Sequence, residues 1–152
     1  MRLGLLVPKD MRALLFFFFS KWTAENGFEA IDARIEDADV CRRYGLDVGC
    51  TRLHADVLTP DDERREKAQE RAFQVIDQAV EQGIRRAMIS HRCQPGTDTE
   101  NSIGIFRKGY APIAEYAEQY DFKLVMEIWH GWGRNLARSP ELEAGVFTRR
   151  PA

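Results

Sequence analysis

The chain is poor in cysteine and in net charge. It contains 3 cysteines among 152 residues, Cys41, Cys50 and Cys93, and no two of them have the spacing of a C-x-x-C metal or redox motif. This usage predicts no disulfide framework and a reducing compartment, the cytoplasm. The formal net charge is −2, so no overall basic character indicates binding to nucleic acid.

The sequence also lacks a hydrophobic run of membrane-spanning length. Residues 14–19 read LLFFFF, far short of the roughly 20 apolar residues that cross a bilayer. Basic residues precede this run as in a signal peptide, but a good small-residue cleavage site does not follow it. We therefore expect no membrane partner and interpret the run as a buried helix face. The composition, 44% hydrophobic and 30% charged, predicts a globular domain with a real core.

One local pattern recurs four times along the chain. A helical stretch ends at a glycine or aspartate, and an apolar run follows it, at Gly27, Gly45, Gly83 and Asp121. The last two intervals, of 38 residues each, suit a complete strand-plus-helix unit, whereas the first, of 18 residues, requires a short helix. The chain is thus predicted to repeat a βα unit.

Apolar residues at steps of three and four predict the helices of these units. The first helix is expected from about Met11 to Asn26, with an apolar face formed by Met11, Leu14, Leu15, Phe18 and Trp22. For the helix before Gly83, Thr59 is the expected N-cap and Pro60 the first helical residue. Its expected buried face is Ala68, Ala72, Val75, Ile76 and Ala79.

Apolar runs between the helices predict five parallel strands. They are expected at Leu3–Val7, Ala30–Ala33, Asp47–Leu53, Arg86–Ser90 and Lys123–Ile128. Right-handed crossovers would place the carboxyl ends of all five strands on one side of the sheet.

Polar side chains gather at those predicted carboxyl ends. Asp32 ends the second strand, His54 follows the third, His91 follows the fourth, and Glu127 and His130 lie at the fifth. A carboxylate within an apolar strand, such as Glu127, is costly to desolvate unless a cation, hydrogen bonds or a metal compensates it. Because all three histidines of the chain fall at strand ends together with this carboxylate, we expect a functional site there.

Five segments resemble one known family in their order and spacing. They are 27–32 (GFEAID) at the second strand, 44–48 (YGLDV) before and within the third, 83–91 (GIRRAMISH) ending the fourth in a histidine, 124–127 (LVME) at the fifth, and 133–136 (GRNL) in the loop after it. Together they resemble the sugar phosphate isomerase/epimerase family, the xylose isomerase-like TIM barrels. The resemblance implies an α/β fold of (β/α)8 type with about five of the eight units present. It implies that 1–152 is a single domain, truncated in its fifth helix.

The resemblance also assigns roles to residues. Glu127 would be a ligand of a divalent metal, Mn, Mg, Co or Zn, and His91 would be a catalytic residue in the substrate pocket. The other ligands of such barrels lie on later strands, so the metal is expected to be weakly bound or unoccupied in this chain.

Four residues are expected to bind the substrate: Asp32, His54, Trp129 and His130. Trp129, with Trp132, would either wall the pocket against the apolar face of a sugar or cover the barrel rim. In the related endonuclease IV branch, the positions of His54 and His91 hold zinc ligands.

The leading reading is a divalent-metal-dependent isomerase or epimerase of a sugar or sugar phosphate. Such an enzyme abstracts a proton next to a carbonyl, and this chain would be incomplete for it.

An endonuclease IV-like zinc phosphodiesterase is an alternative, disfavoured by the lack of a basic surface. A non-catalytic half-barrel that binds a partner is another. An open flavodoxin-like sheet is weakened because no glycine-rich phosphate loop follows the first strand. Open strand edges also predict a homo-oligomer that covers them.

Overall fold

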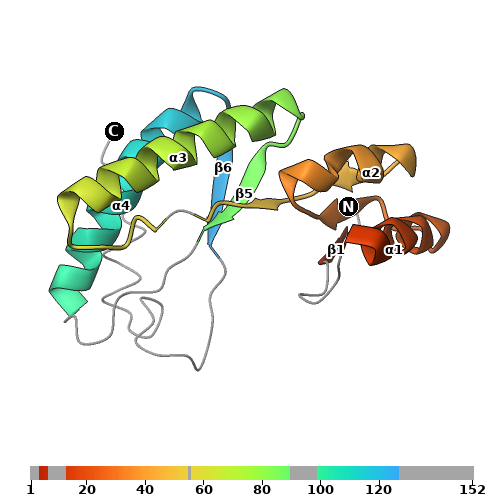
Figure 1. Cartoon of the computed structure of the whole chain (residues 1–152), viewed down its shortest axis with the longest axis horizontal. Helices are drawn as coiled ribbons and strands as arrows, with labels where there is room; N and C mark the ends of the chain where they lie inside the picture. The colour runs from red at the N-terminus through yellow and green to blue at the C-terminus, as the bar shows by residue number, and fades with distance from the viewer. Residues whose placement is uncertain (1–3, 7–12, 55, 90–98, 127–152) are drawn as a thin grey trace.

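Parallel strands alternate with helices along the chain (Figure 1). This computed structural model describes residues 4–6, 13–54, 56–89 and 99–126. The first half contains β1 (Gly4–Leu6), α1 (Ala13–Glu25), β2 (Ala30–Asp32), the 3-10 helix η1 (Ile35–Asp37), α2 (Ala38–Arg43) and β3 (Asp47–Val48). The second half contains β4 (Thr51–Arg52), α3 (Asp62–Glu81), β5 (Arg86–Ile89), α4 (Thr99–Glu118) and β6 (Lys123–Met126).

The strands form two parallel three-stranded sheets, in the orders β1-β2-β3 and β4-β5-β6. β3 and β4 are successive pieces of the expected third strand, Asp47–Leu53, which is interrupted at Gly49 and Cys50. The strand changes its pairing neighbour at Gly49 and Cys50. Before them it pairs with β2, and after them with β5. The sequential strand order is nevertheless that of an incomplete barrel, as the sequence predicted.

The predicted ends of the repeated units are confirmed by their backbone. Gly27, Gly45 and Gly83 have φ of 80°, 71° and 72°, and Asp121 has φ of 49°. The left-handed conformation ends each helix and turns the chain into the next strand. The short first interval is accounted for by η1 and the six-residue α2.

The start of α3 differs from the prediction. Its N-cap is Asp61, whose Oδ1 accepts a hydrogen bond from the Arg64 N–H at 2.9 Å. The Thr59 hydroxyl instead accepts from the Asp61 N–H at 3.3 Å, and Pro60 precedes the helix. An aspartate two residues further on therefore takes the capping role that the sequence analysis gave to Thr59. The expected buried face is confirmed at Ala68, Ala72, Ile76 and Ala79, with Val75 half-buried.

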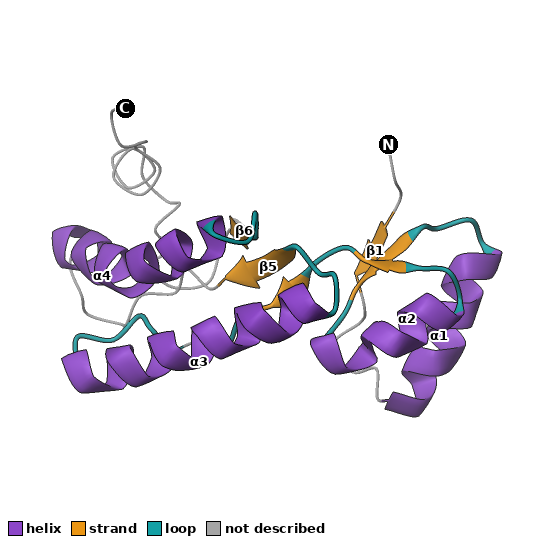
Figure 2. Cartoon of the chain, turned by 90° about the horizontal axis from the view of Figure 1, so that it is seen from above, coloured by secondary structure: helices purple, strands orange, loops and turns teal. Residues whose placement is uncertain are grey.

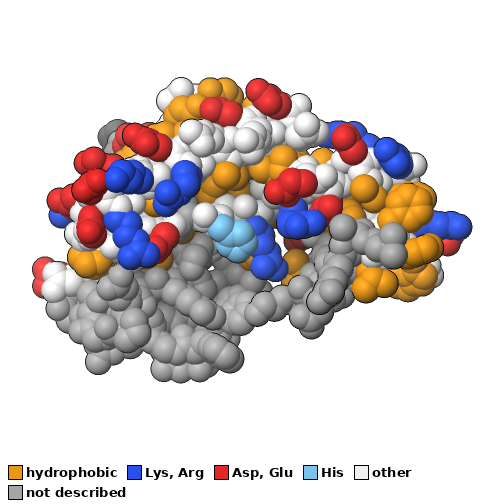
Figure 3. Space-filling model, in the orientation of Figure 1, with side chains coloured by type: hydrophobic (Ala, Val, Ile, Leu, Met, Phe, Trp, Pro, Cys, Tyr) orange, Lys and Arg blue, Asp and Glu red, His pale blue; other side chains and the backbone are white. Residues whose placement is uncertain are grey.

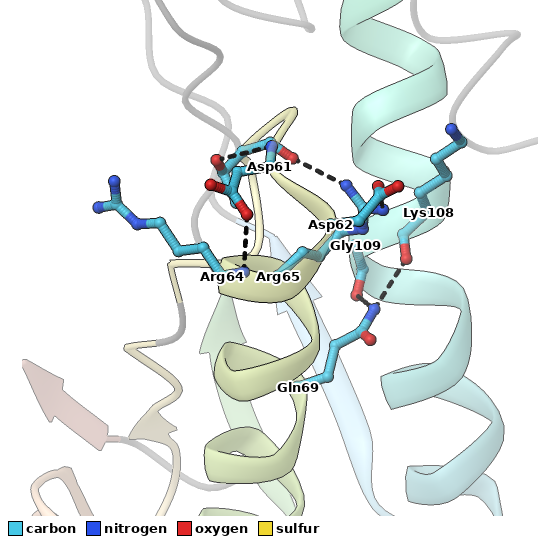
Figure 4. A network of polar contacts seen from close by, with 8 residues as sticks. Asp61, Asp62, Arg64, Arg65, Gln69, Lys108 and Gly109 are labelled. Carbon is cyan, nitrogen blue, oxygen red and sulfur yellow. Dashed lines mark hydrogen bonds and ion pairs between the residues drawn. The ribbon is translucent and has the colours of Figure 1, made fainter.

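A side chain of α3 donates a hydrogen bond to a backbone carbonyl of α4 that has no donor within its own helix (Figure 4). Pro112 lies inside α4 and has no N–H, so the carbonyl of Lys108, four residues earlier, loses its helical donor. Gln69 Nε2 donates to this Lys108 oxygen at 2.8 Å and to the Gly109 oxygen at 3.0 Å. The two helices are thereby joined by polar contacts as well as by packing.

The core lies between the sheets and the helices, with α1 and α2 beside the first sheet and α3 and α4 beside the second (Figures 1 and 2). The larger cluster includes Leu53, Ile76, Ala87, Ile89, Phe106 and Ile113, and the smaller includes Phe16, Ile31, Cys41 and Leu46. None of the helices among the described residues is long and apolar enough to cross a membrane.

The buried face of α1 is not the one expected. Leu15, Phe18 and Trp22 are 54%, 61% and 50% exposed, Met11 lies outside the described residues, and the opposite face is buried. The helix has apolar residues of its own on every side, so the periodicity of the sequence does not indicate which side is buried. The buried side includes Phe16, Ser20 and Thr23. The Ser20 hydroxyl donates to the Phe16 carbonyl at 2.8 Å, and the Thr23 hydroxyl donates to the Phe19 carbonyl at 2.7 Å. These bonds satisfy the hydroxyls and allow two polar side chains to be buried.

Candidate functional site

Alternation along the strands gives the second sheet a face covered by α3 and α4 and an open face, which none of the described helices covers. Leu53, Ala87 and Ile89 pack into the core with α3 and α4. Their neighbours therefore point to the other face, since side chains alternate along a strand. Arg52 of β4 and Met88 of β5 pair in register on this open face.

A cavity of about 380 Å³ lies where β2 and β4 end. Its polar lining includes Asp32, Arg34, Cys50, Arg52 and His54, and its apolar lining includes Phe16, Val75 and Met88. In Figure 3 a histidine and basic side chains border a hollow in the middle of the molecule. Both sheets thus contribute to one site at the carboxyl ends of their strands, the place where α/β proteins bind ligands.

Asp32 is a half-buried carboxylate of this cavity. Burial raises the pKa of Asp32 above its ordinary 3.8, while a backbone hydrogen bond from Cys50 and the charge of Arg52 lower it. Desolvation is the largest of these effects. The carboxylate therefore lies in a less polar environment than water, with a cation nearby.

His54 is exposed and follows β4 by two residues. The structure brings it to the same cavity as Asp32, although the two are 22 positions apart in the sequence. Their roles as substrate-binding residues stay predictions. The other expected site residues, His91, Glu127, Trp129 and His130, lie outside the described residues.

The two arginines of the cavity, Arg34 and Arg52, were not among the expected site residues. Arg34 is engaged by Asp37, with Nε–Oδ2 at 2.9 Å and Nη2–Oδ1 at 3.3 Å. Arg52 makes no ion pair with any described residue, and its positive charge lowers the pKa of Asp32. Its position two residues before His54, on the same face of the strand, was the signal that could have identified it.

Cys50 is a neutral thiol at physiological pH. Burial, followed by the negative charge of Asp32, raises its pKa to about 11. Its Sγ donates to the Thr51 carbonyl at 3.3 Å. Because a nucleophilic cysteine needs a lowered pKa, Cys50 belongs to the wall of the cavity and not to its chemistry.

The described residues do not by themselves fit a divalent metal. No group of three or more His, Cys, Asp or Glu side chains among them is placed to hold an ion. Asp32 and His54 supply at most two ligands, and the expected ligand Glu127 lies beyond the described part of the chain.

The comparisons with known proteins agree with the fold. The family described as xylose isomerase-like TIM barrel matches residues 16–146. The structure of D-psicose 3-epimerase in the presence of D-fructose is similar with a TM-score of 0.71 and 13% identity, covering 97% of this chain and 60% of that one. The xylose isomerase domain protein of Alicyclobacillus acidocaldarius gives 0.69 and 12%, covering 96% and 60%.

A structure of an AP endonuclease, family 2, from Brucella melitensis gives a TM-score of 0.66 at 12% identity, covering 84% of this chain and 55% of that one. A search of curated proteins found no match. The chain spans about 60% of the length of the solved structures named first. Sequential parallel strands, a polar cavity at their carboxyl ends and a family match over most of the chain lead to one conclusion: it belongs to the xylose isomerase-like TIM barrel family.

Proposed function

We propose that this protein binds a sugar or sugar phosphate in the cavity at the ends of β2 and β4, as part of a divalent-metal-dependent isomerase or epimerase. The observation that carries the proposal is the meeting of Asp32, Arg52 and His54 around one cavity of about 380 Å³. Solved structures with the same fold include D-psicose 3-epimerase and L-ribulose 3-epimerase. These names support sugar chemistry for the family.

The cavity has the groups that a sugar requires. A carboxylate accepts hydrogen bonds from hydroxyls, a guanidinium donates to their oxygens, and an imidazole does either. Phe16, Val75 and Met88 line the remainder with apolar surface, which suits the C–H groups of the sugar. Such sites combine apolar walls with few polar groups that fix orientation.

The chemistry proposed is proton abstraction next to a carbonyl. A carboxylate or imidazole within hydrogen-bond reach can take that proton, and positive charge nearby stabilises the oxygen that becomes negative. Arg52 supplies such charge among the described residues, and His91 is the proposed catalytic group. A divalent cation, when bound, would polarise the carbonyl, and Glu127 is its proposed ligand.

Binding is the property to measure first, because the chain spans only about 60% of its structural neighbours. Backbone amide shifts of Asp32, Arg52 and His54 would be followed by NMR as D-fructose is added, with and without Mg²⁺. We expect localised shifts, and at least about tenfold weaker binding for Asp32→Asn and His54→Gln, since the first removes the charge and one acceptor oxygen and the second removes the imidazole. Glu118→Gln, at the end of α4, is the matched control.

Two results would contradict the proposal. One is a wild-type protein whose amide shifts do not respond to D-fructose or D-fructose 6-phosphate. The other is a control variant, Glu118→Gln, that weakens sugar binding as much as Asp32→Asn and His54→Gln do. The metal is tested separately, by titrating Mn²⁺ and following its EPR signal in wild type and Glu127→Gln.

Phosphodiester hydrolysis is the second candidate, favoured by the place of His54 at the end of the third strand and by the endonuclease neighbour. The cavity lining counts against it, because Asp32, Glu36 and Asp37 outnumber Arg34 and Arg52, a balance that repels phosphates. Cleavage of abasic-site DNA without any response to sugars would favour this second function.

We also propose that the protein is cytoplasmic and that copies associate through their open strand edges. Cys41 and Cys50 are free thiols, as a reducing compartment allows. Val125 of β6 and Leu6 of β1 are 42% and 55% exposed, and both strands are outermost in their sheets. Light scattering during gel filtration tests the association, and a monomer at all concentrations would refute it.

A further inference from the structure

Gly49 leaves room for the carboxylate of Asp32. A Cβ built on Gly49 would lie 2.8 Å from Asp32 Oδ1 and 3.7 Å from the Ala30 Cβ. A contact below 3.0 Å is essentially never seen for a real Cβ, so a side chain at position 49 would force the Asp32 carboxylate to move, whereas the second distance is an ordinary contact. The space that every other residue type would fill is therefore occupied by the Asp32 carboxylate.

Backbone conformation does not explain a glycine at this position. Gly27, Gly45 and Gly83 have positive φ, whereas Gly49 is not among the residues with positive φ. Another residue could adopt its backbone without strain, so the close approach of Asp32 is the constraint.

The chain around Gly49 is fastened to β2 on both sides of Asp32. The Gly49 N–H donates to the Ile31 carbonyl at 3.0 Å, and the Ala33 N–H donates to the Cys50 carbonyl at 3.1 Å. The backbone of Cys50 is also close enough to the Asp32 carboxylate to lower its pKa. The carboxylate thus lies against a fixed stretch of backbone at the point where the third strand changes its pairing neighbour.

We propose that Gly49 is a positioning residue for Asp32, which holds the carboxylate against the Gly49–Cys50 backbone and directs it into the cavity shared with Arg52 and His54. The role of the carboxylate toward a sugar rests on the proposed function. The positioning itself does not, because it concerns contacts within the chain.

A double-mutant cycle tests the contact. Urea unfolding is measured for wild type, Gly49→Ala, Asp32→Ala and the double variant. We expect Gly49→Ala to lower the unfolding midpoint clearly in the wild-type background and to have no effect within error in the Asp32→Ala background, because the clash is then removed. Gly104→Ala is the matched control, since a Cβ there meets nothing within 4 Å.

Equal destabilisation by Gly49→Ala in both backgrounds would overturn the proposal. If Gly49→Ala does not fold, a folded double variant supports the proposal, and an unfolded one overturns it.

A second measurement reports position and not stability. The pKa of Asp32 is determined by NMR in wild type and in Gly49→Ala, without sugar. Burial is the main cause that raises the pKa of this group above 3.8, so displacement of the carboxylate should lower it toward 3.8. An unchanged value would overturn the positioning role. D-fructose binding is measured in parallel. If only the proposed function is wrong, the protein does not bind D-fructose, but Gly49→Ala still lowers the pKa of Asp32.

Discussion

Gln69 on α3 provides the hydrogen bond that Pro112 removes from α4. The Lys108 carbonyl faces a proline nitrogen without hydrogen, and the Gln69 amide donates to that carbonyl at 2.8 Å. We expect Gln69→Ala to destabilise the fold by up to about 1 kcal/mol, the usual net value of such a bond. In a Pro112→Ala background the helix regains its own donor, so the same substitution should cost less. Urea unfolding of the four proteins measures the difference, and identical costs would show that the two residues are not coupled.

Asp32 should lower stability at neutral pH. Its pKa is raised above 3.8 in the folded protein, chiefly by burial, so folding favours the protonated carboxyl. The stability gained from this proton is fully present below about pH 3.8, the ordinary value of the group, and is lost as the pH rises through the raised pKa. Asp32→Asn should therefore raise the unfolding midpoint at pH 7 and have little effect near pH 3. A larger gain at pH 3 than at pH 7 would refute this.

Two glycines of α4 should respond oppositely to alanine. A Cβ on Gly109 would lie 2.7 Å from the Val57 carbonyl oxygen, whereas one on Gly104 would meet nothing within 4 Å. Gly104→Ala should stabilise the protein by about 0.5–1 kcal/mol through helix propensity. Gly109→Ala should destabilise it by about 1–3 kcal/mol through overpacking against the loop before α3. Thermal unfolding of both variants checks the sign, and two stabilised proteins would contradict the close approach.

Phenylalanines on the buried and exposed faces of α1 should contribute differently to the stability of the protein. Phe16 is 3% exposed and Phe18 is 61% exposed. We expect Phe16→Ala to cost about 3–5 kcal/mol and Phe18→Ala to change stability by no more than about 0.5 kcal/mol. Trp22→Lys should also reduce binding of a hydrophobic dye, because it interrupts the exposed stripe with Leu15. Similar losses of stability from the two alanine variants would place the helix in a different orientation.

The sequence predicted the repeated units well because their signals are local. A left-handed turn at Gly83 or Asp121, and an apolar stripe such as Ala68 to Ala79, depend on residues close together in the chain. The face of α1 could not be predicted, because apolar residues lie on every side of it and tertiary packing decides. The split of the third strand was missed for a similar reason, since strand pairing depends on distant neighbours.

The site was predicted in part. Asp32 and His54 could be placed at one edge from strand polarity alone, and the structure brings them to one cavity. Arg52 was missed although it alternates with His54 along one strand. The space at Gly49 could not be found from sequence, because it depends on how a strand end packs against its neighbour. The predictions for His91, Glu127, Trp129 and His130 stay predictions.

Because the third strand changes its pairing neighbour, the cavity lies where the two sheets meet. Each half of that strand contributes only two residues to its ladder, β3 on one side and β4 on the other. Asp32 belongs to the first sheet and Arg52 to the second. A molecule that contacted both residues would connect the two sheets at the point where the third strand changes its pairing neighbour.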